Sequence, residues 1–337
     1  MKKLFIGLFV GLMILSLTGC HDKALEEATV AVAAYNDAAE SYNADIMPYN
    51  EACSQIEQAV SNLDAVIDEA QTVINAGEEP YDPSALDSLK VEISEAQNVK
   101  VTPPTIIEPL PLLTIDPEAK TAQLKELKTT AEAKLAEVNS LTIPSTSSIP
   151  DYSKNETAIK DALSVYQDSI QSLKQVTNPD QDFVIDRLQM IDTITEIEAV
   201  TEETDLNGHL NKQGGYTSAI YFRNTLVDLD KVYIEPGLEG LLDIGTDAGG
   251  CIEIFANEND VKNRDTYLAG FDGGILSSGG HYIIGTVLIR TSNALTGTQQ
   301  LELTDAIKEA LLKVIHYSEI ALVGFFADLT VSSVVLI

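Results

Sequence analysis

Three cysteines carry the most obvious covalent chemistry in this chain of 337 residues: Cys20, Cys53 and Cys251. A cysteine thiolate is a nucleophile and a metal ligand, so each position is a candidate for reaction or modification. Cys20 differs from the others because Lys2-Lys3 and an apolar run from Leu4 to Leu15 precede it, followed by small residues. This order is typical of a secretory signal peptide with its cleavage site. The sequence therefore predicts export and cleavage close to Cys20.

The residues Leu17-Thr18-Gly19-Cys20 resemble the lipobox of bacterial lipoproteins. The resemblance implies cleavage between Gly19 and Cys20, which removes residues 1–19 as the signal peptide. It also implies lipidation of Cys20 with diacylglycerol and fatty acyl chains such as palmitate. The mature protein would then be held by a lipid anchor on the extracytoplasmic face of the cell membrane. An uncleaved anchor helix is the alternative, but the apolar run is shorter than the ~20 residues that a bilayer span needs.

The other two thiols are predicted to be unpaired and buried. Two cysteines in segments assigned to different domains form no disulfide framework. Cys251 has the small neighbours Gly249-Gly250 that an exposed nucleophile needs. However, the run Cys-Ile-Glu-Ile-Phe that begins at Cys251 indicates a buried strand. No catalytic residue is therefore assigned, and we expect a protein that is not an enzyme.

Histidines and carboxylates form no recognisable metal motif. His209, His281 and His316 are far apart, and the acidic pairs Asp180-x-Asp182 and Asp228-x-Asp230 complete no calcium loop. We therefore expect no metal site, and the glycine-rich loops lack the spacing of a nucleotide-binding motif, so we expect no cofactor. Those loops could instead form a recognition surface or be ordinary turns. The candidate residues of this recognition surface are Asp272, Ser277, Ser278 and His281.

The charge of the chain restricts its partners. Lys and Arg number 21 against 52 Asp and Glu, which gives a net charge of −31. Such a surface repels nucleic acid, so we expect no nucleic-acid partner. It favours cationic partners, or it simply keeps the protein soluble outside the cell.

Residues 24–76 carry apolar or aromatic residues in alternating steps of three and four, which predicts a coiled-coil-like helix. Three Tyr-Asn pairs, beginning at Tyr35, Tyr42 and Tyr49, recur at intervals of seven, and the tyrosines are expected on the seam. Pro48 lies inside this run, and because the seam keeps its phase, we expect a kinked helix rather than a hairpin.

Further helices are expected at 83–97, 118–140, 153–175 and 179–201, where Asx-Pro pairs or apolar spacing mark them. Proline-rich linkers at 99–117 and 141–153 separate them, and the first should be extended and partly rigid. Residues 20–205 are therefore assigned to an acidic helical stalk or bundle. Whether the helices form a bundle within one chain or a coiled coil between chains is left open.

Near Asp205 the composition changes, and glycine pairs and alternation with a period of two predict a small α+β head domain at 206–337. Its strands are expected at 216–223, 231–235, 250–256 and 281–291, and its helices at about 257–269 and 296–315 on one face of the sheet. The apolar tail, 320–337, is expected to add one or two closing strands rather than a membrane segment. The predicted order is β-β-β-α-β-α-β.

Together these features predict a lipid-anchored cell-surface lipoprotein whose helical stalk presents a binding or scaffolding domain in the cell envelope. The expected partners are the membrane, through the anchor, and an envelope protein or wall ligand. A homodimer through the helical seam stays open. The alternative is an envelope enzyme that acts on a cell-wall or peptide substrate through the head domain. A transporter's substrate-binding lipoprotein is disfavoured because the head is too small for two α/β lobes.

Overall fold

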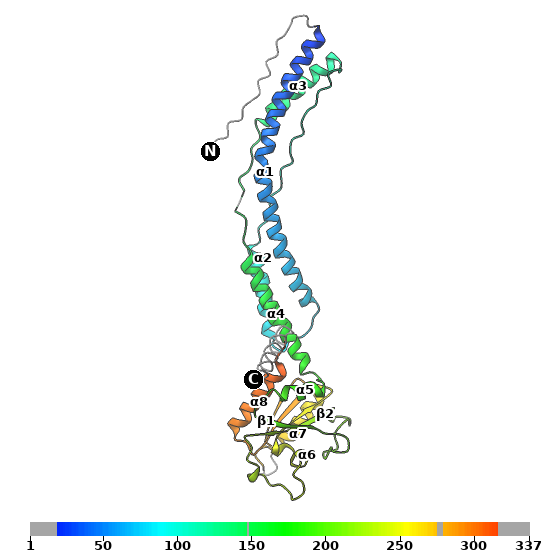
Figure 1. Ribbon diagram of the computed structural model, residues 1–337, viewed down its shortest axis with the longest axis vertical. Helices are drawn as coiled ribbons and strands as arrows, with labels where there is room; N and C mark the ends of the chain where they lie inside the picture. The colour runs from blue at the N-terminus through cyan, green and yellow to red at the C-terminus, as the bar shows by residue number, and fades with distance from the viewer. Residues whose placement is uncertain (1–18, 147, 275–278, 316–337) are drawn as a thin grey trace, which may run out of the picture. The chain divides into compact units, whose positions relative to one another are not determined.

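The computed structural model describes residues 19–146, 148–274 and 279–315. Within these ranges the chain is a mixed α+β protein with long helices and one five-stranded antiparallel sheet (Figure 1). It divides into two compact units. The first contains the described residues up to Val66 and Ala96–Glu156; the second contains Ile67–Glu95 and the described residues from Thr157 onward.

The first expected helix forms as one continuous element, α1 (Cys20–Asn75). Its helical path continues through Pro48, so this run is not a hairpin. The part from Cys20 to Val66 covers about 70 Å at 1.5 Å per residue. Among the helices that the structure describes, none combines the length and the apolar content needed to cross a bilayer.

The predicted seam of α1 is buried in the first unit. Val32, Tyr35 and Ala39 of α1 form one apolar cluster with Ala131 and Val138, which are buried residues of α3 (Thr121–Val138). Half-buried leucines of the proline-rich segment pack against the same cluster: Leu110 and Leu113. Burial of this part of the seam therefore requires no second chain.

Asparagines of the Tyr-Asn pairs bind the proline-rich segment in a regular register. Each side-chain amide both donates to the carbonyl oxygen and accepts from the backbone N–H of one residue in that segment. We call these three pairs the asparagine ladder: Asn36 with Leu113, Asn43 with Leu110, and Asn50 with Ile107. Tyr35 and Tyr49 add hydroxyl bonds to the carbonyl oxygens of Pro111 and Thr105. The segment is extended, as expected, and it runs antiparallel to α1.

Three of the four further helices agree with expectation, and one does not. The first three are α2 (Pro83–Val99), α3 and α4 (Ser153–Gln175). The helix expected over 179–201 ends early, because α5 spans only Gln181–Leu188 and β1 (Ile194–Ala199) follows. Asp180, rather than Asn178, caps α5 by accepting from the N–H of Asp182. The sheet therefore begins before the composition changes at Asp205.

The second unit contains the sheet, whose strand order is β1-β2-β3-β5-β4. The remaining strands are β2 (Ser218–Asn224), β3 (Gly249–Ile254), β4 (Gly280–Ile284) and β5 (Val287–Thr291). All neighbouring pairs are antiparallel. The strand expected at 231–235 is absent from this described region, and the single strand expected at 281–291 is a tight hairpin of β4 and β5.

Helices cover both faces of the sheet, which corrects the expectation of one covered face. Ile252 and Ile254 of β3 pack with residues of α5 and α8 (Gly297–Leu312) such as Val184 and Ile307. On the opposite face, Cys251 packs in the cluster that includes Val261 and Leu268 of α7 (Glu258–Ala269) and Leu241 of the short α6 (Leu241–Ile244). A strand buried on both faces needs apolar residues at successive positions, as in Val287-Leu288-Ile289 of β5.

From residue 206 onward, with the short helices between β2 and β3 set aside, the described order is β-β-α-β-β-α, so the predicted order is not confirmed. The helices expected over 257–269 and 296–315 form as α7 and α8. Asn257 accepts from the N–H of Asp260 at the start of α7, and Thr296 and Gln299 form the capping box of α8. The closing strand expected at 320–337 lies outside the described residues.

Candidate functional site

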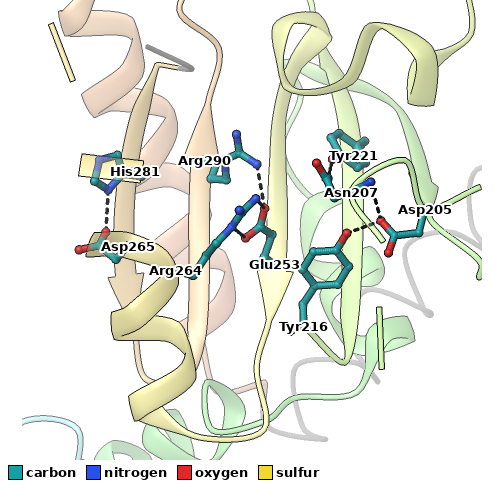
Figure 2. A network of polar contacts seen from close by, with 9 residues as sticks. All are labelled: Asp205, Asn207, Tyr216, Tyr221, Glu253, Arg264, Asp265, His281 and Arg290. Carbon is teal, nitrogen blue, oxygen red and sulfur yellow. Dashed lines mark hydrogen bonds and ion pairs between the residues drawn. The ribbon is translucent and has the colours of Figure 1, made fainter. Parts of the chain in front are cut away.

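The alternation of side chains along β3 places a carboxylate inside the sheet domain. Cys251 and Glu253 point to the face covered by α7, while Ile252 points to the face covered by α8. The register pairs Cys251 with Arg290 of β5, so Arg290 and Glu253 share this face as diagonal neighbours (Figure 2). The strand geometry therefore brings an acid and a base together in the interior.

Glu253 is fully buried and is held by two arginines. Arg264 of α7 donates from Nε and Nη2 to the two carboxylate oxygens at 2.8 Å each, and Arg290 donates from Nη1 at 2.8 Å (Figure 2). Burial alone would raise the pKa of Glu253, but these donors and their charges hold the pKa below its ordinary value. Glu253 is therefore ionised and fixes both guanidinium groups.

This buried network shares one carboxylate between two guanidinium groups, and Arg290 is only 7% exposed. The Nε of Arg290 is buried and has no hydrogen-bond partner among the described residues. The charge of Arg290 favours the ionised form of Asp247, although burial raises the pKa of Asp247. A guanidinium group in the interior favours an anion in its neighbourhood.

A second polar group lies beside this network. Tyr216 donates its hydroxyl to Asp205, and the backbone N–H of Leu210 donates to the same carboxylate at 2.7 Å. Burial opposes the charge on Asp205, but these hydrogen bonds keep its pKa below the usual value. Burial and Asp205 together raise the pKa of Tyr216, so its hydroxyl stays protonated. Asn207 also donates to the hydroxyl of Tyr221 at 3.3 Å.

Next to Arg264 the surface contains a cavity of about 400 Å³, which we call the aromatic cleft. This volume is within the range of small-molecule sites. The cleft is lined by the 205–216 loop, including the backbone of Gly214-Gly215, by the residue that follows β3, and by α7. Its lining side chains are His209, Tyr216, Phe255, Asn263, Arg264 and Tyr267. A Cβ atom at Gly215 would lie 2.0 Å from the carbonyl oxygen of His209, so this wall of the cleft requires glycine.

The aromatic side chains give the cleft fixed walls. Tyr216 and Phe255 are each 1% exposed and meet edge to face at 6.4 Å between ring centroids. Tyr267 is 59% exposed, and the Arg264 guanidinium lies 5.6 Å from its ring centroid. The cleft therefore combines two buried inner rings, one solvent-exposed outer ring and a fixed cation.

Two of the four predicted recognition residues lie together. Nδ1 of His281 in β4 is 2.6 Å from a carboxylate oxygen of Asp265, and Nε2 is 3.1 Å from one of Asp272. These contacts tie α7 and the residues after it to the edge strand of the sheet. Ser277 and Ser278 lie outside the described residues. The cleft was not predicted, and neither Asp272 nor His281 lines it.

The cysteines occupy different environments. Cys20 is exposed and is the first residue of α1, whereas Cys53 and Cys251 are free and buried. Burial, with Glu253 nearby, raises the pKa of the Cys251 thiol well above its usual range. The prediction of unpaired, buried thiols at these two positions is therefore confirmed. Within the described residues, no cluster of three or more His, Cys, Asp or Glu is arranged to hold a metal ion.

Comparison of the chain with family models, with curated proteins and with solved structures found no significant match. The function must therefore be inferred from the residues themselves.

Sequence reasoning missed the aromatic cleft and the charged network under it. One signal was present: Glu253 interrupts an otherwise apolar strand, Cys-Ile-Glu-Ile-Phe, and a carboxylate at an inward position needs a buried cationic partner. Two arginines, Arg264 and Arg290, follow at positions that a helix and a strand could direct to it. Identifying these arginines as the partners of Glu253 required the register of β3 and β5, which the sequence does not reveal.

Proposed function

We propose that this chain is a lipid-anchored lipoprotein of the bacterial cell envelope that works by binding, with Cys20 as its acylated residue. The observation that carries the proposal is the position of Cys20. It directly follows a lipobox-like sequence, it is exposed, and it begins α1. Two or more acyl chains on this exposed residue would give the stable anchoring that one chain does not.

In this proposal the helical unit that contains Cys20–Val66 and Ala96–Glu156 is a stalk. The asparagine ladder supports this role, because it fastens the proline-rich segment along α1 and so stiffens a region whose linkers would otherwise be free. The buried seam supports a stalk built from one chain. The sheet-containing unit presents the aromatic cleft as its binding site. Its fixed donors and rings are features of recognition, and we propose no reaction for them.

The anchor can be tested by metabolic labelling with an alkyne fatty acid in a bacterial host. Wild-type protein should take up the label and fractionate with membranes. Cys20→Ala should lose the label, and it should either be released or keep its first nineteen residues, which mass spectrometry would reveal. Cys53→Ala is the matched control, because it removes a thiol from the same helix and should leave labelling unchanged. Wild-type protein without label would contradict the proposal.

A further inference from the structure

The chemistry of the aromatic cleft indicates what it can hold. Arg264 supplies its only cation among the described lining residues. Glu253 engages Nε and Nη2 of this guanidinium, and Nη1 has no hydrogen-bond partner in the described part of the chain. The guanidinium of this lining residue is therefore held in a fixed orientation. A donor whose rotamers are already restricted loses little entropy when it binds an acceptor.

The charge around this donor selects for an anion. Glu253 is shared between Arg264 and Arg290, so Arg264 has no carboxylate of its own. Asp205, which is bonded to the lining residue Tyr216, already accepts hydrogen bonds from Tyr216 and Leu210. An anion at the cleft would give Arg264 a second ionised acceptor, and a hydrogen bond between ionised partners is roughly twice as strong as a neutral one.

The number of donors favours a carboxylate over a phosphate. One free guanidinium nitrogen and the amide of Asn263 can bind the two oxygens of a monoanion. A phosphate dianion normally requires more donors, and a chain with a net charge of −31 repels multiply charged anions. The rings of Tyr216, Phe255 and Tyr267 then form walls for a flat apolar group attached to the carboxylate.

We propose that the aromatic cleft binds a carboxylate carried on a flat apolar body, either a free aromatic acid or the carboxyl end of a peptide with an aromatic last residue. Arg264 binds the carboxylate through Nη1, and Tyr267 covers the apolar body. The inference deepens the binding part of the proposed function and does not depend on the lipid anchor.

The test uses the full chain, purified in detergent, and measures binding by calorimetry. N-acetyl-phenylalanine is the free-acid probe, and N-acetyl-phenylalaninamide is its uncharged match. A second pair, Ala-Ala-Ala-Phe with a free or an amidated carboxyl end, distinguishes a peptide end from a free acid. We expect at least one free carboxylate probe to bind about tenfold or more tightly than its amide, which is the effect of losing one charge-assisted hydrogen bond.

Variants then locate the site. Tyr267→Ala should weaken carboxylate binding severalfold, and it should fold because this ring is 59% exposed. Arg264→Lys keeps a positive charge beside Glu253 but removes the free Nη1, so it should reduce the preference for acid over amide. Lys262→Ala is the matched control, since this residue of α7 pairs with Glu258 on the surface and lies outside the cleft. It should bind like the wild type.

Three results would overturn the proposal. One is equal affinity for acid and amide in both pairs, and another is no binding of any probe at millimolar concentration. The third is binding that Tyr267→Ala leaves unchanged. None of these results would affect acylation of Cys20, so failure of this inference and failure of the anchor are separately visible.

Discussion

The side-chain amide of Asn43 pairs with the backbone of Leu110 as another strand would, donating to its carbonyl oxygen at 2.9 Å and accepting from its N–H at 2.7 Å. The same pairing recurs seven residues away along α1 and three residues away along the proline-rich segment. Seven residues of helix rise about 10.5 Å, and three residues of extended chain cover about 9 to 11 Å. The two periods therefore match, and each rung of the asparagine ladder falls in register.

Asn43→Ala should loosen the proline-rich segment. The change leaves the N–H and carbonyl of Leu110 without a protein partner, and because both residues are half-buried we expect a cost of about 1–2 kcal/mol in local stability. Hydrogen exchange measures it directly, as faster exchange of the amides near Leu110. Asn62→Ala is the control, since Asn62 is exposed on the same helix and bonds only to Gln58. Equal exchange in both variants would contradict a structural role for the ladder.

The ladder shows which part of this unit the sequence could predict. The seam was predictable because it depends on spacing within one helix, and the tyrosines belong to that spacing. Spacing within one helix could not assign partners to the asparagines, because these partners lie 57 to 77 residues away. Their repeat beside each tyrosine was visible in the sequence, but its meaning required knowing what packs against α1.

Glu253→Gln should destabilise the sheet-containing unit strongly. The variant leaves two guanidinium groups without an anionic partner in the interior, and breaking a buried ion pair in this way costs about 3–5 kcal/mol. Urea unfolding followed by circular dichroism measures the change. Glu258→Gln is the control, because Glu258 makes an exposed ion pair with Lys262, and exposed pairs contribute little.

The same carboxylate predicts how stability depends on pH. The pKa of Glu253 is lower in the folded protein than its ordinary value of 4.5, so its contribution is fully present above that value. It is lost as the pH falls through the lowered folded pKa, because the folded state must then take up a proton. Between neutral and strongly acidic pH, the wild type should therefore lose more stability than Glu253→Gln. Parallel acid unfolding curves for the two proteins would contradict this.

The charged network was harder to predict than the strands that carry it. The run from Gly250 to Ala256 was predicted as a strand, and β3 forms there. The network also needs the pairing of β3 with β5, and the expected single strand at 281–291 hid the hairpin that creates this pairing. Gly285 was the missed signal, since a glycine inside a strand pattern often marks a turn or bulge.

Cys251 should be unreactive while the protein is folded. Its side chain is fully buried, and its raised thiol pKa leaves almost no thiolate at neutral pH. In a Cys53→Ser background, a maleimide should modify Cys251 only on the timescale of unfolding, which peptide mass spectrometry can follow. The same reaction in urea should be fast and serves as the control. Rapid modification of the folded chain would instead indicate an accessible nucleophile, and it would revive the enzyme alternative.

Gly285→Ala should be among the most damaging small changes in the sheet. Gly285 adopts a φ of +57° in the β4–β5 hairpin, where a side chain costs about 1–2 kcal/mol. An added Cβ would also lie 2.2 Å from the carbonyl oxygen of Val176, which accepts from the N–H of Thr286 at 2.9 Å. The hairpin or the end of α4 must therefore move, and we expect a total loss above about 2 kcal/mol in the free energy of unfolding.

Gly297→Ala provides the opposite case on the same unit. Gly297 is the first residue of α8, and an added Cβ there would meet nothing within 4 Å. Alanine restricts the unfolded chain more than glycine does, so this variant should be neutral or more stable by up to about 1 kcal/mol. Urea unfolding of the two variants side by side separates the effects. If both were equally harmless, the hairpin turn would not depend on the conformation of Gly285, and the placement of Arg290 opposite Cys251 would need another explanation.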